Sequence, residues 1–113
     1  YATLDAKDIT NASVVKLWIK DDGSVLNFSR KIDDKGHINL AKMHLGIYAY
    51  RASFLKQFVK WPQSERELNT QLEQMRAMDN DEIIYAKESI SNIHLGVDTE
   101  EELEFAKEIA SSL

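Results

Sequence analysis

The sequence contains no cysteine, a single proline and only four glycines in 113 residues. The lack of cysteine excludes disulfide scaffolds, thiol catalysis and zinc sites built on thiolates. The chain also has no glycine-rich phosphate loop, neither GxGxxG nor GxxxxGK[ST]. If the protein binds a nucleotide, the segment that binds its phosphates therefore lies elsewhere. No apolar run approaches the roughly 20 residues that span a bilayer.

Positive charge is also scarce, because 14 basic residues stand against 19 acidic ones and the net charge is −5. Nucleic acid and anionic membranes are bound by clustered Lys and Arg, and no such cluster occurs, so we expect neither as a partner. The content of 43% hydrophobic and 29% charged residues is typical of one globular domain. The opening run Tyr1-Ala2-Thr3-Leu4 resembles the middle of a strand, which predicts a piece of a longer protein.

Besides residues 1–4, which predict a short strand, four segments have the pattern of β-strands. Residues 14–19 and 25–29 are rich in β-branched and aromatic side chains, and Asp21-Asp22-Gly23 between them predicts a hairpin. Residues 44–50 predict a further strand, whose alternation places His44 and Tyr48 on one face. Residues 83–86 predict a short one.

Three segments have the pattern of helices. Ser53 is positioned to cap a helix over residues 54–59. A capping box of Ser64 and Glu67 predicts a helix that continues to Met78 at helical spacing. Thr99 and Glu102 form a second capping box, which predicts a C-terminal helix through Leu103, Ala106, Ile109 and Ala110. Strands that alternate with helices favour an α/β fold with a mixed sheet.

A few polar residues are candidates for chemistry on their residue type alone. His44 is a possible acid or base and Tyr48 can orient a hydroxyl, although a hydrogen-bonded His beside a packed Tyr explains the same pattern. Glu73 and Gln74 also fit a solvated helix face. Asp98 is either a ligand for a divalent cation or a residue that favours the start of the last helix.

Several short runs occur in a characteristic order along the chain. They are Ala2-Thr3-Leu4, Val14-Val15-Lys16, Phe28-Ser29-Arg30, His44-Leu45-Gly46-Ile47-Tyr48-Ala49-Tyr50-Arg51, Phe54-Leu55, Trp61, Leu72-Glu73-Gln74-Met75-Arg76-Ala77 and Gly96-Val97-Asp98-Thr99. Together they resemble the 3-deoxy-manno-octulosonate (Kdo) cytidylyltransferase, or CMP-Kdo synthetase, family. The resemblance covers nearly the whole chain. Departures such as Thr99-Glu100 in place of Thr-Pro leave room for a relative that activates another acidic sugar or a phosphonate.

The resemblance implies a fold and a function for the chain. The fold would be α/β, a nucleotide-diphospho-sugar-transferase-like mixed sheet flanked by helices and here only a partial domain. Residues 1–113 would be the C-terminal sugar-binding and dimerisation portion, without the N-terminal CTP-binding half. The family is a cytoplasmic, Mg²⁺-dependent homodimer that joins CTP and Kdo to give CMP-Kdo and pyrophosphate for lipopolysaccharide synthesis. The alternative is a non-catalytic module that kept the fold.

The resemblance also assigns roles to single residues. It implies that Asp98 binds magnesium and that Arg30 binds the sugar carboxylate or hydroxyls. It also implies that His44 and Tyr48 line the sugar pocket. Glu73 and Gln74 would form hydrogen bonds to sugar hydroxyls. The implied sugar-binding residues are Arg30, His44, Tyr48, Glu73 and Gln74. We further expect the apolar residues of the hairpin to form an exposed dimer patch. These residues are Leu17, Trp18, Leu26 and Phe28.

Overall fold

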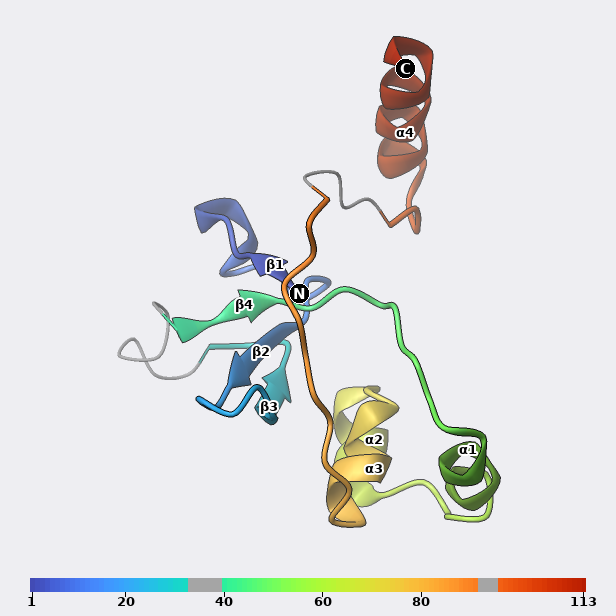
Figure 1. Ribbon diagram of the computed structural model, residues 1–113. Coiled ribbons are helices and arrows are strands. Elements are labelled where there is room, and N and C mark those ends of the chain that lie inside the picture. Colours follow the sequence, from blue (N-terminus) through green and yellow to red (C-terminus); the bar gives the residue numbers. More distant parts are fainter. Residues whose placement is uncertain (33–39, 92–95) are drawn as a thin grey trace.

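The computed structural model describes residues 1–32, 40–91 and 96–113 (Figure 1). It contains a four-stranded sheet of order β1-β4-β2-β3. The strands are β1 (Ala2–Thr3), β2 (Lys16–Ile19), β3 (Val25–Ser29) and β4 (Lys42–Met43). The predicted α/β fold is confirmed, and the strand pairings among the described residues are all antiparallel.

The helices follow the sheet in the chain, except for one short 3-10 turn, η1 (Ala6–Asp8). They are α1 (Ala52–Phe58), α2 (Glu65–Thr70), α3 (Gln74–Asp79) and α4 (Glu100–Ser112). In Figure 1, α2 and α3 lie beside the hairpin, α1 lies at the far end of an extended connection, and α4 stands apart. Within the described ranges, none of these helices combines the length and the apolar character that crossing a membrane requires.

The predicted hairpin is confirmed as β2 and β3, with Leu17 opposite Phe28. The turn needs Gly23 because its φ of +85° lies in the region that other residues avoid. The carboxylate of Asp22 accepts hydrogen bonds from the backbone N–H and the hydroxyl of Ser24, which closes the turn. Local sequence therefore determines this element.

The core forms between one face of the hairpin and the segment that leads into α3. It consists of Val15, Leu17, Val25, Phe28, Leu72 and Met75. Leu17 and Phe28 are only 2% and 3% exposed, so they are not available for the exposed dimer patch that we expected from the hairpin. Of that set, Leu26 is the residue that lies on the surface, at 57% exposure.

Residues 44–50 do not form the predicted strand. β4 ends at Met43, and the backbone N–H of His44 makes the last bond to β2, donating to the carbonyl of Val15. The chain then leaves the sheet and runs extended to α1 (Figure 1). Alternating side chains favour extended backbone, but a strand also needs a neighbour to pair with. In addition, α1 begins after Arg51, and Ser53 lies inside the helix instead of capping it.

Two further predicted elements are shorter than expected. Residues 83–86 make one isolated antiparallel bridge, between Tyr85 and Ser24, instead of a strand. The helix predicted from Ser64 to Met78 is divided into α2 and α3, because Gln71 adopts a left-handed conformation with φ of +55°. Half of the predicted capping box forms: Ser64 caps α2 by accepting from the backbone N–H of Glu67, whereas the carboxylate of Glu67 accepts from Arg76.

Lys16 has a fully buried side chain at the base of the hairpin. Its ammonium group donates to the carbonyl oxygens of Asn11 at 2.6 Å and Arg30 at 2.8 Å. Burial lowers its pKa from the ordinary value. The charge therefore acts as a fixed hydrogen-bond donor that joins the turn before β2 to the end of β3.

Replacing Lys16 with Met is expected to lower the free energy of unfolding by about 1–3 kcal/mol, because the two carbonyls lose their donor. Urea denaturation followed by circular dichroism measures this. Lys20→Met is the matched control, since Lys20 is exposed at the end of β2 and its loss should change stability by no more than about 0.5 kcal/mol. Equal stability of the two variants would contradict the role of Lys16.

Candidate functional site

A cavity of about 710 Å³ lies between the extended segment 44–51 and the segment 82–89. Core residues of the hairpin form part of its wall, and Gln74 and Ala77 reach it from α3. Most of the lining is apolar or aromatic. The polar groups that converge on it include the side chains of His44, Tyr48 and Gln74, an arrangement typical of small-molecule sites.

His44 and Tyr48 contact each other directly, as their predicted shared face implied. The imidazole Nε2 and the phenol oxygen are 2.6 Å apart. Phe28 of the core packs edge-on against the imidazole ring, with ring centroids 5.7 Å apart. The prediction of proximity is correct although the segment is not a strand.

Burial keeps both groups of this pair uncharged. It is the main cause of the lowered pKa of His44, to which the positive N-terminus adds. Burial likewise raises the pKa of Tyr48, assisted by Tyr50 and by the negative charge of Glu73. At neutral pH the pair therefore offers one hydroxyl and one neutral imidazole to a ligand.

The neutral state of His44 predicts a pH dependence of stability. Because its pKa is lower in the folded protein than in the unfolded chain, the unfolded chain takes up protons first as the pH falls below about 6.5. The free energy of unfolding should therefore decrease from pH 7 to pH 5, by less than about 1.4 kcal/mol per pH unit. In His44→Gln this part of the decrease should be missing. Denaturation curves of both proteins at several pH values give the difference, and identical pH profiles would contradict the assignment.

Gln74 and Glu73 are adjacent in the sequence but face different surroundings. The side-chain nitrogen of Gln74 is buried and has no hydrogen-bond partner among the residues that the structure describes, and the residue lines the cavity. Buried amides are almost always paired, so this nitrogen is available for a ligand. Glu73 is exposed and borders a second, more open depression with Gln63 and Gln71. Burial is the main cause of the raised pKa values of Tyr48 and Tyr50, and the charge of Glu73 adds to both.

Arg30 is bound to main-chain carbonyls and does not line the cavity. Its guanidinium donates to the carbonyls of Thr70 at 2.9 Å, Ala12 at 3.2 Å and Gln71 at 3.3 Å. It thereby ties the end of the hairpin to the end of α2. The structure does not bring it together with His44 and Gln74.

Asp98 lies just before α4, away from the cavity. Its carboxylate makes no hydrogen bond or ion pair to the described residues, and its backbone N–H donates to Glu102 at 2.7 Å. The predicted capping box is confirmed, because Thr99 and Glu102 each bond to the backbone of the other. In the part of the chain that the structure describes, no three histidine or carboxylate side chains come together to hold a metal ion.

A row of aromatic rings beside the cavity went unrecognised as a unit in the sequence. Tyr48 stacks on Tyr50, and Tyr50 stacks on Phe54, with ring centroids 5.6 and 5.5 Å apart. Phe54 in turn contacts Phe58 and Trp61. The four-residue spacing from Tyr50 through Phe54 to Phe58 was the available signal.

Comparison with known proteins gives consistent matches over most of the chain. A sequence profile described as Cytidylyltransferase matches residues 2–93. The 3-deoxy-manno-octulosonate cytidylyltransferase of Haemophilus influenzae is 36% identical over 122 aligned positions, which cover 96% of this chain and 48% of the relative. The protein of that name from Koribacter versatilis is 39% identical, with 94% and 42% covered.

A solved structure is also similar. It is CMP:2-keto-3-deoxy-manno-octonic acid synthetase complexed with CTP, with a TM-score of 0.86 and 28% identity. The match covers 98% of this chain and 47% of that one. The chain thus spans about half the length of the relatives that it matches.

Proposed function

Because this chain belongs to the cytidylyltransferase family, we propose that it is the sugar-binding part of an enzyme that activates Kdo with CTP. Residues 1–113 form the C-terminal portion of that enzyme, and CTP binds mainly to the portion that precedes it. The names of the relatives and their doubled length support this proposal. The enzyme acts in the cytoplasm, where CTP is available, and its product CMP-Kdo is used for lipopolysaccharide synthesis.

The observation that carries the proposal is the cavity with His44, Tyr48 and the amide nitrogen of Gln74, which has no partner among the described residues. A sugar acid has many hydroxyls that each donate and accept, so it is matched by neutral groups that do both. The hydroxyl of Tyr48 and the amide of Gln74 provide such groups, and the imidazole nitrogen of His44 that is not bonded to Tyr48 adds a donor or an acceptor according to its tautomer. Glu73, at the start of α3, borders the neighbouring depression instead of the cavity, so its role as an acceptor for a sugar hydroxyl remains a prediction.

In the reaction, these residues hold the sugar so that its anomeric hydroxyl faces the α-phosphate of CTP. The anomeric oxygen forms a bond to the α-phosphorus, the bond to pyrophosphate breaks, and the hydroxyl proton leaves to water. Positioning is the main contribution of this chain. A sugar that is already held in the right orientation avoids the entropic cost of bringing two free substrates together. Arg30 as a cation for the sugar carboxylate remains a prediction, since the described residues already occupy three of its N–H groups.

Asp98 is the residue of this chain that we propose as a ligand of Mg²⁺. Its exposed carboxylate makes no bond to the described residues, which fits an ion that takes one or two carboxylates together with water and substrate phosphates. When bound, Mg²⁺ neutralises charge on the phosphates and on the sugar carboxylate. A single carboxylate does not make a complete site, and within the described ranges no further carboxylate or histidine gathers with Asp98 to complete one.

We also propose that the enzyme is a homodimer. The edge strand β3 pairs with β2 on one side, and on its outer side the N–H of Val25 at its start donates to the carbonyl of Ile84. Farther along β3, Leu26 is 57% exposed. Such an edge can pair with a second copy. Sedimentation at about 10 μM should show a dimer, since ordinary interfaces bind at or below this concentration. Leu26→Lys should shift the chain toward monomer, and a wild-type chain that sediments only as monomer would count against the dimer.

Calorimetric titration of the chain with Kdo tests the function. We expect binding with Kd of about 1 mM or tighter, and about tenfold weaker binding by Gln74→Leu, since one or two hydrogen bonds are lost. Gln57→Leu is the control, because Gln57 is an exposed residue of α1 that does not line the cavity. A second titration with N-acetylneuraminate tests the alternative that the site binds another acidic sugar, in which case this sugar should bind more tightly than Kdo. Absence of heat with either sugar would refute the assignment of the pocket.

A further inference from the structure

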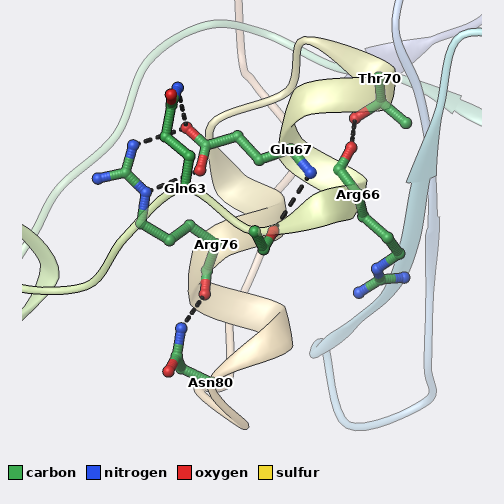
Figure 2. Close-up of polar contacts among 7 residues, drawn as sticks. Gln63, Arg66, Glu67, Thr70, Arg76 and Asn80 are labelled. Carbon is green, nitrogen blue, oxygen red and sulfur yellow. Dashed lines mark hydrogen bonds and ion pairs between the residues drawn. The ribbon is translucent and has the colours of Figure 1, made fainter.

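A buried ion pair joins α2 to α3 on the side of the helices that faces α1 (Figure 2). The Nε and Nη2 atoms of Arg76 donate to the two carboxylate oxygens of Glu67 at 2.8 and 2.6 Å. The side chains are only 15% and 6% exposed. Gln63 adds a third donor to the same carboxylate at 3.3 Å. Such a two-pronged pair fixes orientation as well as distance.

Arg76 also touches the row of aromatic rings. Its guanidinium carbon lies 4.4 Å from the centre of the Phe58 ring on α1, a cation–π contact. Phe58 contacts Phe54, and from there the stacked rings lead to Tyr48 and its partner His44. An unbroken series of contacts therefore connects Arg76 with the wall of the cavity formed by the segment 44–51.

The same arginine is close in sequence to the opposite wall. Arg76 lies on the six-residue helix α3, two residues after Gln74. Figure 1 shows α1 between a long extended connection and a short link to α2, so contacts across to α3 help to determine where α1 and the rings lie. Arg76 contacts both parts of the cavity wall. It lies on the same helix as Gln74, and its guanidinium packs on the ring of Phe58.

We propose that Arg76, oriented by Glu67, is a positioning residue that fixes the aromatic wall bearing Tyr48 relative to the helix end bearing Gln74. The cavity is thereby set to its working width before a ligand enters, which reduces the cost of binding. That the ligand is a sugar rests on the proposed function. The coupling, by which Arg76 fixes the two walls relative to each other, does not depend on that function.

The chain offers a matched control for this inference. Arg66 and Asp79 form a second ion pair between α2 and α3, with a contact of 2.6 Å and side chains that are 49% and 25% exposed. In Figure 2 the guanidinium of Arg66 points away from Glu67 and Arg76. Removing Arg66 therefore breaks a bridge between the same two helices without touching the rings.

The test is NMR of the intact chain, observing the side-chain amide of Gln74 and the ring signals of Tyr48 and His44. We expect Arg76→Met to move the signals on both walls together, Glu67→Gln to reproduce these shifts, and Arg66→Met to leave them in place. Arg76→Lys keeps the charge but not the fork, so it should not restore the wild-type spectrum. Equal shifts in the Arg76 and Arg66 variants, or a response of one wall only, would overturn the proposal.

Stability and function are separated by two further measurements. In the double variant Glu67→Leu with Arg76→Met, an apolar pair replaces the ion pair and folding should be retained. Displaced signals in that folded protein support positioning, whereas wild-type signals refute it.

Titration with Kdo should show binding about tenfold weaker than wild type in the folded double variant, and unchanged in Arg66→Met. If the wild-type chain binds no Kdo while the signals still move, the proposed function fails and the coupling stands. If the double variant binds Kdo as wild type does, the coupling fails.

Discussion

The isolated 113-residue chain is expected to release no pyrophosphate from CTP and Kdo above the uncatalysed rate. Its sequence has no glycine-rich loop to cradle phosphates, and the cavity is lined mainly by apolar and aromatic side chains. Without aligned phosphates the anomeric hydroxyl has no in-line target. A loss of this kind removes the whole catalytic advantage, which for enzymes is about 10⁶-fold or more. A coupled pyrophosphate assay measures it.

Activity should appear when the missing portion is supplied. The joined protein for this experiment consists of the part of the Haemophilus influenzae relative that this chain does not cover, about half of its length, followed by this chain. We expect pyrophosphate release with CTP and Kdo, and an increased KM for Kdo but not for CTP in Gln74→Leu. Turnover by the isolated chain would contradict the division of labour that we propose, and so would an effect of Gln74→Leu on the KM for CTP alone.

The elements that were predicted correctly are those determined by neighbouring residues. The hairpin follows from two β-branched segments and a turn whose glycine adopts φ of +85°. The start of α4 follows from a reciprocal capping box of Thr99 and Glu102. In both cases the interactions that form the element lie within a few residues of one another, so the sequence pattern contains them.

The elements that were predicted wrongly depend on distant partners. The segment 44–50 has strand-like alternation, but it lacks a neighbouring strand once β4 ends at Met43. The break between α2 and α3 at Gln71 coincides with carbonyls of Thr70 and Gln71 that accept from Arg30 on the hairpin. Periodicity does not show either constraint, because each arises from tertiary packing.

The candidate site divides in the same way. The proximity of His44 and Tyr48 followed from their spacing, whereas the separation of Gln74 from Glu73 depends on how α3 lies against the hairpin. The pair of Glu67 and Arg76 spans nine residues across a left-handed turn, so no helical spacing of three or four indicates it. A contact between side chains of two helices can be predicted only after the turn between the helices is known.

Replacing Asp98 with Asn should leave the fold unchanged but lower the turnover of the joined protein by about 100-fold or more, if the carboxylate holds Mg²⁺ as we propose. Stability should change by no more than about 0.5 kcal/mol, because the carboxylate makes no bond to the described residues and Asn preserves its shape. The loss should be partly recovered at high Mg²⁺, since the remaining ligands still bind the ion weakly.

Thr99→Ala is the control that separates a metal ligand from a residue of the helix start. The hydroxyl of Thr99 accepts from the backbone N–H of Glu102, so its loss should cost α4 about 1 kcal/mol and reduce helix content in circular dichroism. That defect should not depend on Mg²⁺ concentration, whereas the defect of Asp98→Asn should. Full turnover of Asp98→Asn at limiting Mg²⁺ would refute the metal role, and it would leave Asp98 with no function beyond its place before α4.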